Sequence, residues 1–282
     1  MSRRIFEEKR YNIAEQVVSY ENFVPFIDQG KEGFAVNPEY IPEIIAHAEG
    51  LLGKEYPVLR ASEFMMFARM GNRSVYQDKY FPRRADALAL AVAEYVEGKG
   101  RFTDALIDLV WMLLEETTWV LPAHTREMKM PGKEQQPTSL PYTYGEEVDY
   151  IDLFAATTAA TVSWIYYISK DTFDQVNPVI GERILYELNR RIVKPFLNPV
   201  NWSRGMWWTG CDGRRVNNWN PWIISNILTV CALTVKDFYT REAIVKAALP
   251  MLDCFISVYH EDGGCDDGFS GIKIFYRKCA NR

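Results

Sequence analysis

Apolar residues recur at three- and four-residue spacing over residues 83–98 and again over residues 101–116. Such spacing places the apolar side chains on one face of an α-helix. Gly98 and Gly100 separate the two segments, so the sequence predicts two amphipathic helices joined by a tight turn. The predicted buried faces consist of Leu88, Ala91, Val92 and Tyr95 in the first helix, and of Leu106, Leu109, Val110 and Leu113 in the second.

This arrangement of two helical segments recurs twice further along the chain. Residues 149–170 are followed by residues 178–197, and residues 222–238 are followed by residues 240–259. No series of alternating strand-like segments is present, and Gly and Pro separate helices rather than strands. The sequence therefore predicts an all-α fold, in which three helical hairpins stack and share one core.

The 282 residues are enough for one large domain or two ordinary ones. We expect residues 1–80 to form an irregular amino-terminal region with one helix within residues 38–53. Residues 81–270 carry the predicted hairpins, and residues 271–282 form a divergent tail.

Charge and composition limit the classes of partner. The chain has 32 basic and 37 acidic residues, which argues against a nucleic-acid binder with a dispersed basic surface. The amino terminus lacks the apolar run of a secretory signal. The longest uncharged run, residues 153–169, is rich in Thr and Ser and falls short of the roughly 20 apolar residues of a bilayer span. We therefore expect a cytoplasmic protein with neither nucleic-acid nor membrane partners.

Cysteine and acidic motifs give no sign of a metal or cofactor. The five cysteines are widely spaced and include no CxxC pair, which is typical of reduced thiols. An EF-hand register that starts at Asp262 places Lys273 at the twelfth position, where calcium needs a bidentate acid. We therefore expect neither a metal site nor a cofactor.

Three loops at predicted helix ends carry Trp, Asn, Arg and His side chains: residues 117–125, 205–222 and 259–270. Indole rings stack on the apolar faces of sugars, while Arg and Asn pair with carboxylate or hydroxyl groups. We therefore expect these loops to bind an acidic polysaccharide or oligosaccharide. The candidate substrate-binding residues are His124, Trp207, Trp208, Arg214, Arg215, Trp219 and Trp222.

An ordered set of segments resembles the amino-terminal domain of heparinase II/III-family polysaccharide lyases, over roughly residues 55–270. The segments are GNRSVYQDKYFPRR, EETTWVLPAHT, VDYIDLFAATTAA, NNWNPWIISN and DGGCDDG. The resemblance implies an incomplete (α/α) toroid followed by a β-sandwich, and cleavage of uronate-containing glycans by β-elimination. It also implies that Asn217 and Asn218 are catalytic because they neutralise the substrate carboxylate, with Trp219 and Trp222 shaping the subsite.

The sequence departs from this family pattern after residue 270. The resemblance implies a catalytic Tyr shortly after the DGG motif, but the only tyrosine beyond Ser270 is Tyr276, which is out of register. We therefore expect a truncated chain that lacks the β-sandwich and in which catalysis is lost more readily than recognition. Members of the family are often exported, and an opened toroid exposes an apolar edge that permits self-association.

Some of these residues also have a simpler, structural interpretation. His124 can instead be a loop histidine that is bonded to the backbone, while Trp111 and Trp164 lie inside apolar helices and are predicted to be core residues. Arginines near helix ends usually remain solvated or pair with acids, rather than bind a glycan. The arginines concerned are Arg73, Arg83 and Arg84, and the nearby acids are Glu115 and Glu116.

Three functions therefore stay open. The first is a uronate-glycan lyase, and the second is a glycoside hydrolase on an (α/α) scaffold, which needs two carboxylates across a cleft. The third is a non-catalytic fragment that binds acidic glycans or serves as a scaffold. The candidate hydrolase carboxylates are Glu146, Glu147, Asp262, Asp266 and Asp267.

Overall fold

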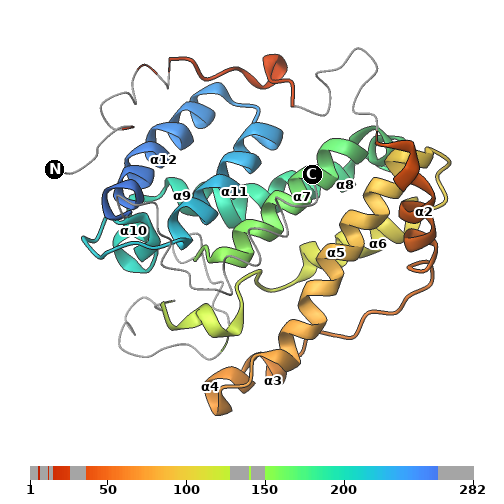
Figure 1. Cartoon of the computed structure of the whole chain (residues 1–282), viewed down its shortest axis with the longest axis horizontal. Coiled ribbons are helices and arrows are strands. Elements are labelled where there is room, and N and C mark those ends of the chain that lie inside the picture. Colours follow the sequence, from red (N-terminus) through yellow and green to blue (C-terminus); the bar gives the residue numbers. More distant parts are fainter. Residues whose placement is uncertain are drawn as a thin grey trace.

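The computed structural model describes residues 6, 12, 15–25, 36–127, 140 and 150–259 (Figure 1). Within these residues the chain forms helices and no strand, which confirms the predicted all-α class. None of the helices in the described ranges is long and apolar enough to cross a membrane.

Three helical hairpins form the body of the molecule. Helix α5 (Ser74–Glu97) packs against α6 (Thr103–Glu115), α7 (Leu153–Val176) against α8 (Val179–Leu188), and α11 (Trp219–Thr234) against α12 (Phe238–Val258). The predicted pairing is therefore confirmed. The other elements are η1 (Tyr20–Asn22), η3 (Pro38–Tyr40), α2 (Ile41–Glu49), α3 (Ala61–Phe64), α4 (Met66–Met70), η4 (Pro122–Glu127), the π-helical turn η5 (Asn189–Val193), α9 (Lys194–Leu197), α10 (Pro199–Arg204) and η6 (Trp207–Thr209).

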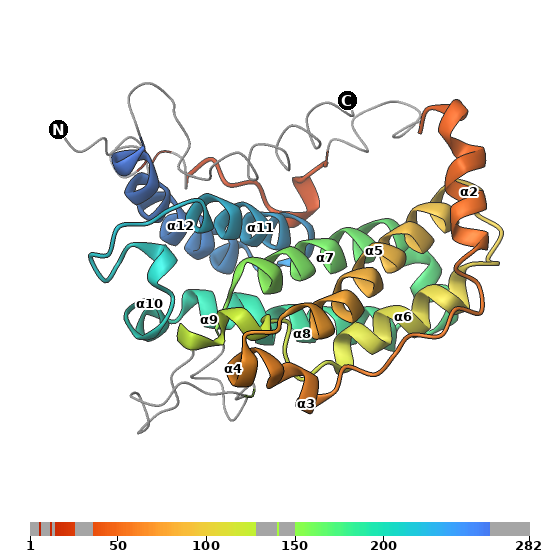
Figure 2. The same ribbon diagram turned by 60° about the horizontal axis from the view of Figure 1, so that its bottom comes forward.

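Helix α7 occupies the centre of the arrangement. It packs against α5 on one side and α11 on the other, so the first helices of the three hairpins are neighbours. Figure 2 shows α6, α8 and α9 in a second layer beneath α5 and α7. Helix α2, which confirms the predicted amino-terminal helix, packs against α5. Helix α5 begins at Ser74, so the domain boundary expected after residue 80 falls inside it.

Local signals in the sequence explain where these helices begin and end. Gly98 adopts φ +65° after the last turn of α5, a left-handed conformation that glycine accepts without a steric cost. At the start of α7, one carboxylate oxygen of Asp152 accepts the N–H groups of Phe154 and Ala155 at 3.1 and 2.7 Å. Asp237 caps α12 in the same way and accepts the Thr240 N–H at 2.7 Å.

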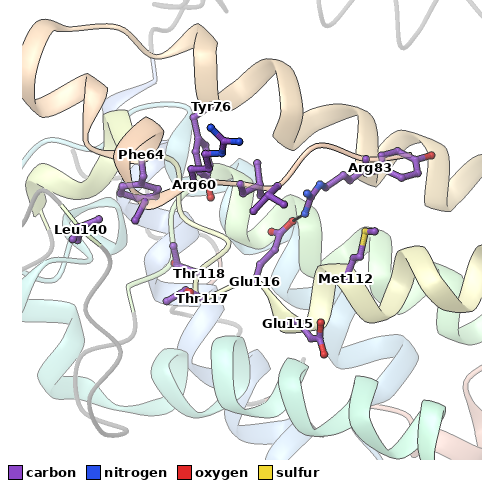
Figure 3. Close-up of a pocket in the computed structure, with 14 residues that line it drawn as sticks. Arg60, Phe64, Tyr76, Arg83, Met112, Glu115, Glu116, Thr117, Thr118 and Leu140 are labelled. Atoms are coloured by element: carbon purple, nitrogen blue, oxygen red, sulfur yellow. Dashed lines mark hydrogen bonds and ion pairs between the residues drawn. The ribbon is translucent and has the colours of Figure 1, made fainter. Parts of the chain in front are cut away.

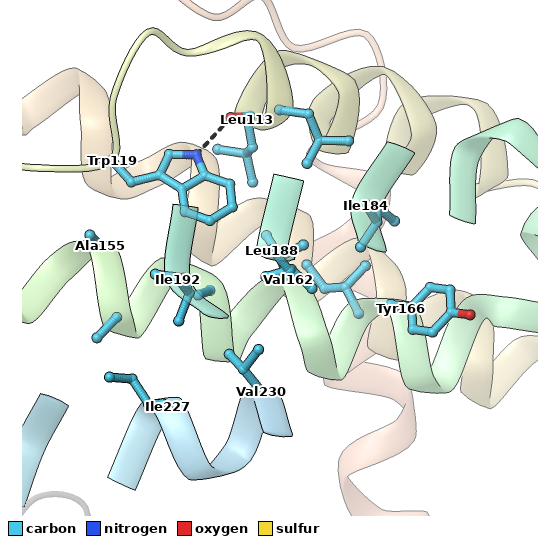
Figure 4. Packing of buried hydrophobic residues seen from close by; sticks show 14 of the residues in the cluster. Leu113, Trp119, Ala155, Val162, Tyr166, Ile184, Leu188, Ile192, Ile227 and Val230 are labelled. Carbon is cyan, nitrogen blue, oxygen red and sulfur yellow. Dashed lines mark hydrogen bonds between the residues drawn. The ribbon is translucent and has the colours of Figure 1, made fainter. Parts of the chain in front are cut away.

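The core lies on both sides of α7. Figure 4 shows Leu113 of α6 and Ile184 of α8 on one side of this helix, and Ile227 and Val230 of α11 on the other. Trp119 is fully buried there, and its indole N–H donates to the carbonyl oxygen of Leu113 at 2.8 Å. All four predicted core positions of α6 are buried. The predicted face of α5 is wrong in part, because Leu88 and Tyr95 are exposed while Leu90 is buried. The reason is that α5 packs against α2, α6 and α7 together, so several of its faces are covered.

Two tryptophans predicted to lie in the core are only half-buried. Trp111 donates its indole N–H to Glu115 at 3.1 Å, and the Arg183 guanidinium lies 5.9 Å from its ring. Trp164 makes an edge contact with the ring of Tyr167, at 6.2 Å between centroids. The helices that carry Trp111 and Trp164 are apolar on most faces. The sequence therefore did not indicate that these two indoles would lie at the edge of the core.

A buried charge network joins the first two hairpins. Arg83 and Arg84 of α5 both donate to the carboxylate of Glu116, at 3.3 and 3.0 Å for one oxygen, and Arg84 also donates to the other oxygen. Arg191, in the π-helical turn, donates to the Glu116 carbonyl oxygen at 2.6 Å. The pairing expected for Arg83 and Arg84 is thus confirmed. Arg73 is exposed and donates to Gln77 at 3.2 Å.

The loop that precedes α11 depends on a glycine with little free space around it. Gly210 has φ +76°, and a Cβ atom there would lie 2.8 Å from Cys254 Cβ and 2.9 Å from Cys254 Sγ. We expect Gly210→Ala to lower the free energy of unfolding by about 2–4 kcal/mol, from overpacking plus backbone strain. Gly213→Ala is the matched control, because Gly213 has φ +78° with nothing within 4 Å. Urea unfolding measures both, and equal losses would contradict the packing explanation.

Candidate functional site

Segments that are distant in sequence meet in one group of rings, which we call the Trp219 cluster: His124, Phe154, Trp207 and Trp219. The His124 ring stacks on Phe154 at 5.8 Å with 14° between the planes, and its centroid lies 4.7 Å from that of Trp219. Trp207 follows at 5.3 Å from Trp219. Loops 117–125 and 205–222 therefore converge beside the start of α7, whereas loop 259–270 lies outside the described residues beyond Tyr259.

His124 is held by a carboxylate. Its Nδ1 atom lies 2.6 Å from Asp152 Oδ2, and the same oxygen accepts the Leu121 N–H at 3.1 Å. The side chain of Asp152 has no exposed surface, while that of His124 retains 12%. The backbone N–H of His124 donates to the Leu121 carbonyl oxygen, but its imidazole contacts the Asp152 side chain rather than the backbone.

The start of α11 presents Trp219. Asn217 is exposed, and its side-chain oxygen accepts the Trp219 N–H at 3.0 Å. Asn218 is half-buried at the N-cap position of α11, and its carbonyl oxygen accepts the Trp222 N–H at 3.2 Å. Both asparagines are therefore next to the Trp219 cluster, and their catalytic role stays a prediction.

Trp222 lies one turn further along α11. Its indole N–H donates to the Thr157 hydroxyl of α7 at 3.0 Å, and its ring is half-buried. This bond ties the first turn of α11 to α7. Trp222 therefore helps to hold the start of α11, which carries Trp219, against α7.

The prediction that Trp208 binds sugar is wrong. Its ring is fully buried, it stacks on Phe196 at 6.4 Å, and its indole N–H donates to the Ile151 carbonyl oxygen at 2.8 Å. Trp207 and Trp208 are consecutive in the short turn η6, so their side chains point in different directions. Trp207 is half-buried at the cluster, and Trp208 belongs to the core.

Positive charge lies at the edge of the cluster. The Arg214 guanidinium is 5.9 Å from the centroid of the Trp207 ring, and its Nε–H donates to Asp212 at 2.6 Å. Arg214 and Arg215 are both exposed. The Arg214 side chain is 49% exposed and that of Asp212 is 16% exposed, so the guanidinium is partly accessible to solvent.

One residue that matters here was not singled out from the sequence. Asn220 is fully buried, and its amide group donates to the carbonyl oxygens of Trp208 and Met251, each at 2.8 Å. It thereby fixes the loop that carries Trp207 to both α11 and α12. The signal in the sequence that could have pointed to Asn220 was its position as the third asparagine of the NNWNPW motif.

A separate pocket of about 540 Å³ lies between α5 and the end of α6 (Figure 3). Its charged residues include Arg83 and Glu116, which point toward each other and are already paired. Burial raises the pKa of Tyr76, which keeps its hydroxyl neutral. None of the candidate site residues lines this pocket, so we place the candidate site at the Trp219 cluster.

Across the described ranges, no group of three His, Cys, Asp or Glu residues is arranged to hold a metal ion. Outside the described residues lie the carboxylates considered for a hydrolase and the tyrosine near the carboxyl terminus, namely Glu146, Glu147, Asp262, Asp266, Asp267 and Tyr276.

No protein-family model matches this sequence, and no curated protein matches it either.

Proposed function

We propose that this chain binds a uronate-containing acidic glycan at the Trp219 cluster and cleaves it by β-elimination. The observation that carries the proposal is the convergence of two half-buried indoles, an imidazole held by a carboxylate, and exposed arginine and asparagine side chains. Aromatic faces stack on sugar rings, and guanidinium groups bind carboxylates with two parallel hydrogen bonds.

The reaction assigns a role to each group. Elimination removes the proton from the carbon that bears the uronate carboxylate, so the negative charge that develops must be stabilised. Asn217 and Asn218 donate amide hydrogen bonds to that carboxylate, and Arg214 and Arg215 bind acidic groups of neighbouring sugars. Trp207 and Trp219 form the stacking surface.

We also propose that the hairpins form an incomplete (α/α) toroid, as in the lyase family that the sequence resembles. The order of neighbours supports this proposal, because α5, α7 and α11 are adjacent and α6 contacts α8. In such a toroid, the loops at one end of the hairpins line the substrate cleft, which agrees with the meeting of loops 117–125 and 205–222.

The test is an elimination assay with the full chain and a set of uronate polymers. We expect new ultraviolet absorbance from the unsaturated product, with a loss of at least tenfold for Trp219→Ala, equivalent to about 1.4 kcal/mol. Trp164→Ala is the matched control, because Trp164 is a half-buried tryptophan of α7 that makes its ring contact with Tyr167, away from the cluster. It is expected to retain activity.

Other outcomes would replace the proposal. New reducing ends without new absorbance would identify a glycoside hydrolase. Binding of a uronate oligosaccharide without any turnover would identify a non-catalytic glycan-binding protein. If no uronate glycan is bound or cleaved, the assignment of the Trp219 cluster is wrong.

A further inference from the structure

We propose that His124 is the catalytic base at this site and that Asp152 is its positioning residue. The inference rests on the proposed function, because it requires a substrate with an acidic C–H bond beside a carboxylate. It goes further by naming the atom that receives the proton, Nε2 of His124, and the group that keeps this atom available.

The hydrogen bonds of Asp152 determine which imidazole nitrogen carries a hydrogen. Its Oδ1 accepts the N–H groups of Phe154 and Ala155, and its Oδ2 accepts the N–H of Leu121. A carboxylate surrounded by donors in this way acts only as an acceptor. The 2.6 Å contact to His124 Nδ1 is therefore a hydrogen bond in which the imidazole donates. In the neutral ring, Nε2 then carries the lone pair.

The surroundings of the ring leave Nε2 available. The imidazole lies between Phe154, stacked at 14°, and Trp219, tilted at 59°. Nε2 makes no hydrogen bond with any described residue, and it is not among the buried polar atoms that lack a partner. The His124 side chain keeps 12% of its surface exposed, next to the ring of Trp219.

The charges around the imidazole suit this role. Asp152, from the start of α7, is the charged group in direct contact with the ring. Phe154 and Trp219, the rings packed against it, are uncharged, and Arg214 lies beyond Trp207. A buried carboxylate stabilises the imidazolium that forms when the proton arrives.

The step balances within the substrate and the dyad. Nε2 removes the proton on the carbon that bears the carboxylate, so a C–H bond breaks and an N–H bond forms. The electron pair of the C–H bond becomes the new C=C double bond, and the neighbouring C–O bond breaks with its electrons on the glycosidic oxygen. That oxygen takes the proton back from the imidazolium, which returns His124 to its starting state without any further reactant.

The first test is nitrogen-15 NMR of the histidine side chains of the full chain. There are three histidines, so His47→Gln and His124→Gln variants assign the signals. We expect neutral His124 to carry its hydrogen on Nδ1, and we expect the Nε2 signal to shift when a saturated uronate tetrasaccharide binds. A hydrogen on Nε2 would overturn the inference whether or not a glycan binds. Failure of every uronate ligand to bind would instead reject the proposed function itself.

The second test measures turnover. We expect His124→Gln to lower kcat by about 10²–10⁴-fold, the usual contribution of a general base, with oligosaccharide affinity within about twofold of the parent. His47→Gln, at an exposed position of α2, is the control and should leave kcat unchanged. Added imidazole should restore part of the activity of His124→Gly, which a merely structural histidine would not permit. Unchanged kcat in His124→Gln would overturn the inference.

Asp152→Asn separates positioning from catalysis. We expect the variant to move the hydrogen of His124 to Nε2, because the asparagine amide donates where the carboxylate accepted. We also expect kcat to fall. Since Asp152 also caps α7, the circular dichroism of the variant is measured in parallel. If it does not fold, the His124 variants and the NMR measurement still decide the inference.

Discussion

Replacement of Glu116 by glutamine is expected to lower the free energy of unfolding by about 3–5 kcal/mol, because two buried arginines lose their counterion. The side chains of Arg83 and Arg84 retain only 7% and 8% of their exposure, so water does not replace the lost partner. A glutamine offers one acceptor oxygen, and its NH₂ group faces a guanidinium that can only donate. The effect is therefore larger than the loss of one hydrogen bond.

Urea unfolding followed by circular dichroism measures this loss. Asp174→Asn is the control, because Asp174 pairs with Lys170 on the surface of α7, where both side chains are about 40% exposed. Surface pairs of this kind contribute about 0–1 kcal/mol. A similar loss in the two variants would show that the Glu116 network is not desolvated as the structure has it.

The second large effect concerns the two adjacent tryptophans of η6. Trp208→Ala is expected to cost about 3–5 kcal/mol of stability, because it leaves a cavity in the core and deprives the Ile151 carbonyl oxygen of its donor. Trp207→Ala is expected to cost much less, because its ring is only half-buried. If the proposed function is correct, Trp207→Ala also lowers uronate oligosaccharide affinity by about tenfold, or about 1.4 kcal/mol.

These two variants control for each other, since they remove the same side chain at consecutive positions. Chemical denaturation gives the stability of each variant, and isothermal titration calorimetry at a temperature where both are folded gives the affinity. Loss of stability in Trp207→Ala that equals the loss in Trp208→Ala would contradict their different burial. Full affinity in Trp207→Ala would remove this ring from the proposed stacking surface.

Much of the fold was predictable because the sequence signals of a helix are local. The apolar spacing of residues 101–116 identified the buried face of α6 correctly, since mainly one face of that helix meets the core. The face of α5 was harder to predict, because three neighbouring helices cover different sides of it. The spacing of apolar residues indicates a single buried face for a helix. It therefore did not identify Leu90 as buried, and it wrongly identified Leu88 as buried.

The sequence predicted which types of residue form the candidate site. It predicted less well which of these residues are neighbours in space. The aromatic and histidine content of two loops indicated His124, Trp207 and Trp219, which the structure brings together. Asp152 was missed, although an aspartate before an apolar run is a normal helix-cap signal. Its contact with His124 depends on the path of the intervening chain, which no local pattern records.

The three roles of Asp152 link the chemistry of the cluster to local unfolding. The same carboxylate caps the first turn of α7, anchors the loop at Leu121 and orients the His124 imidazole. Fraying of that turn would release the imidazole at the same moment, so the site and the end of the helix open as one cooperative unit. Amide hydrogen exchange at Leu121, Phe154 and Ala155 therefore reports directly on how often the imidazole leaves its working orientation.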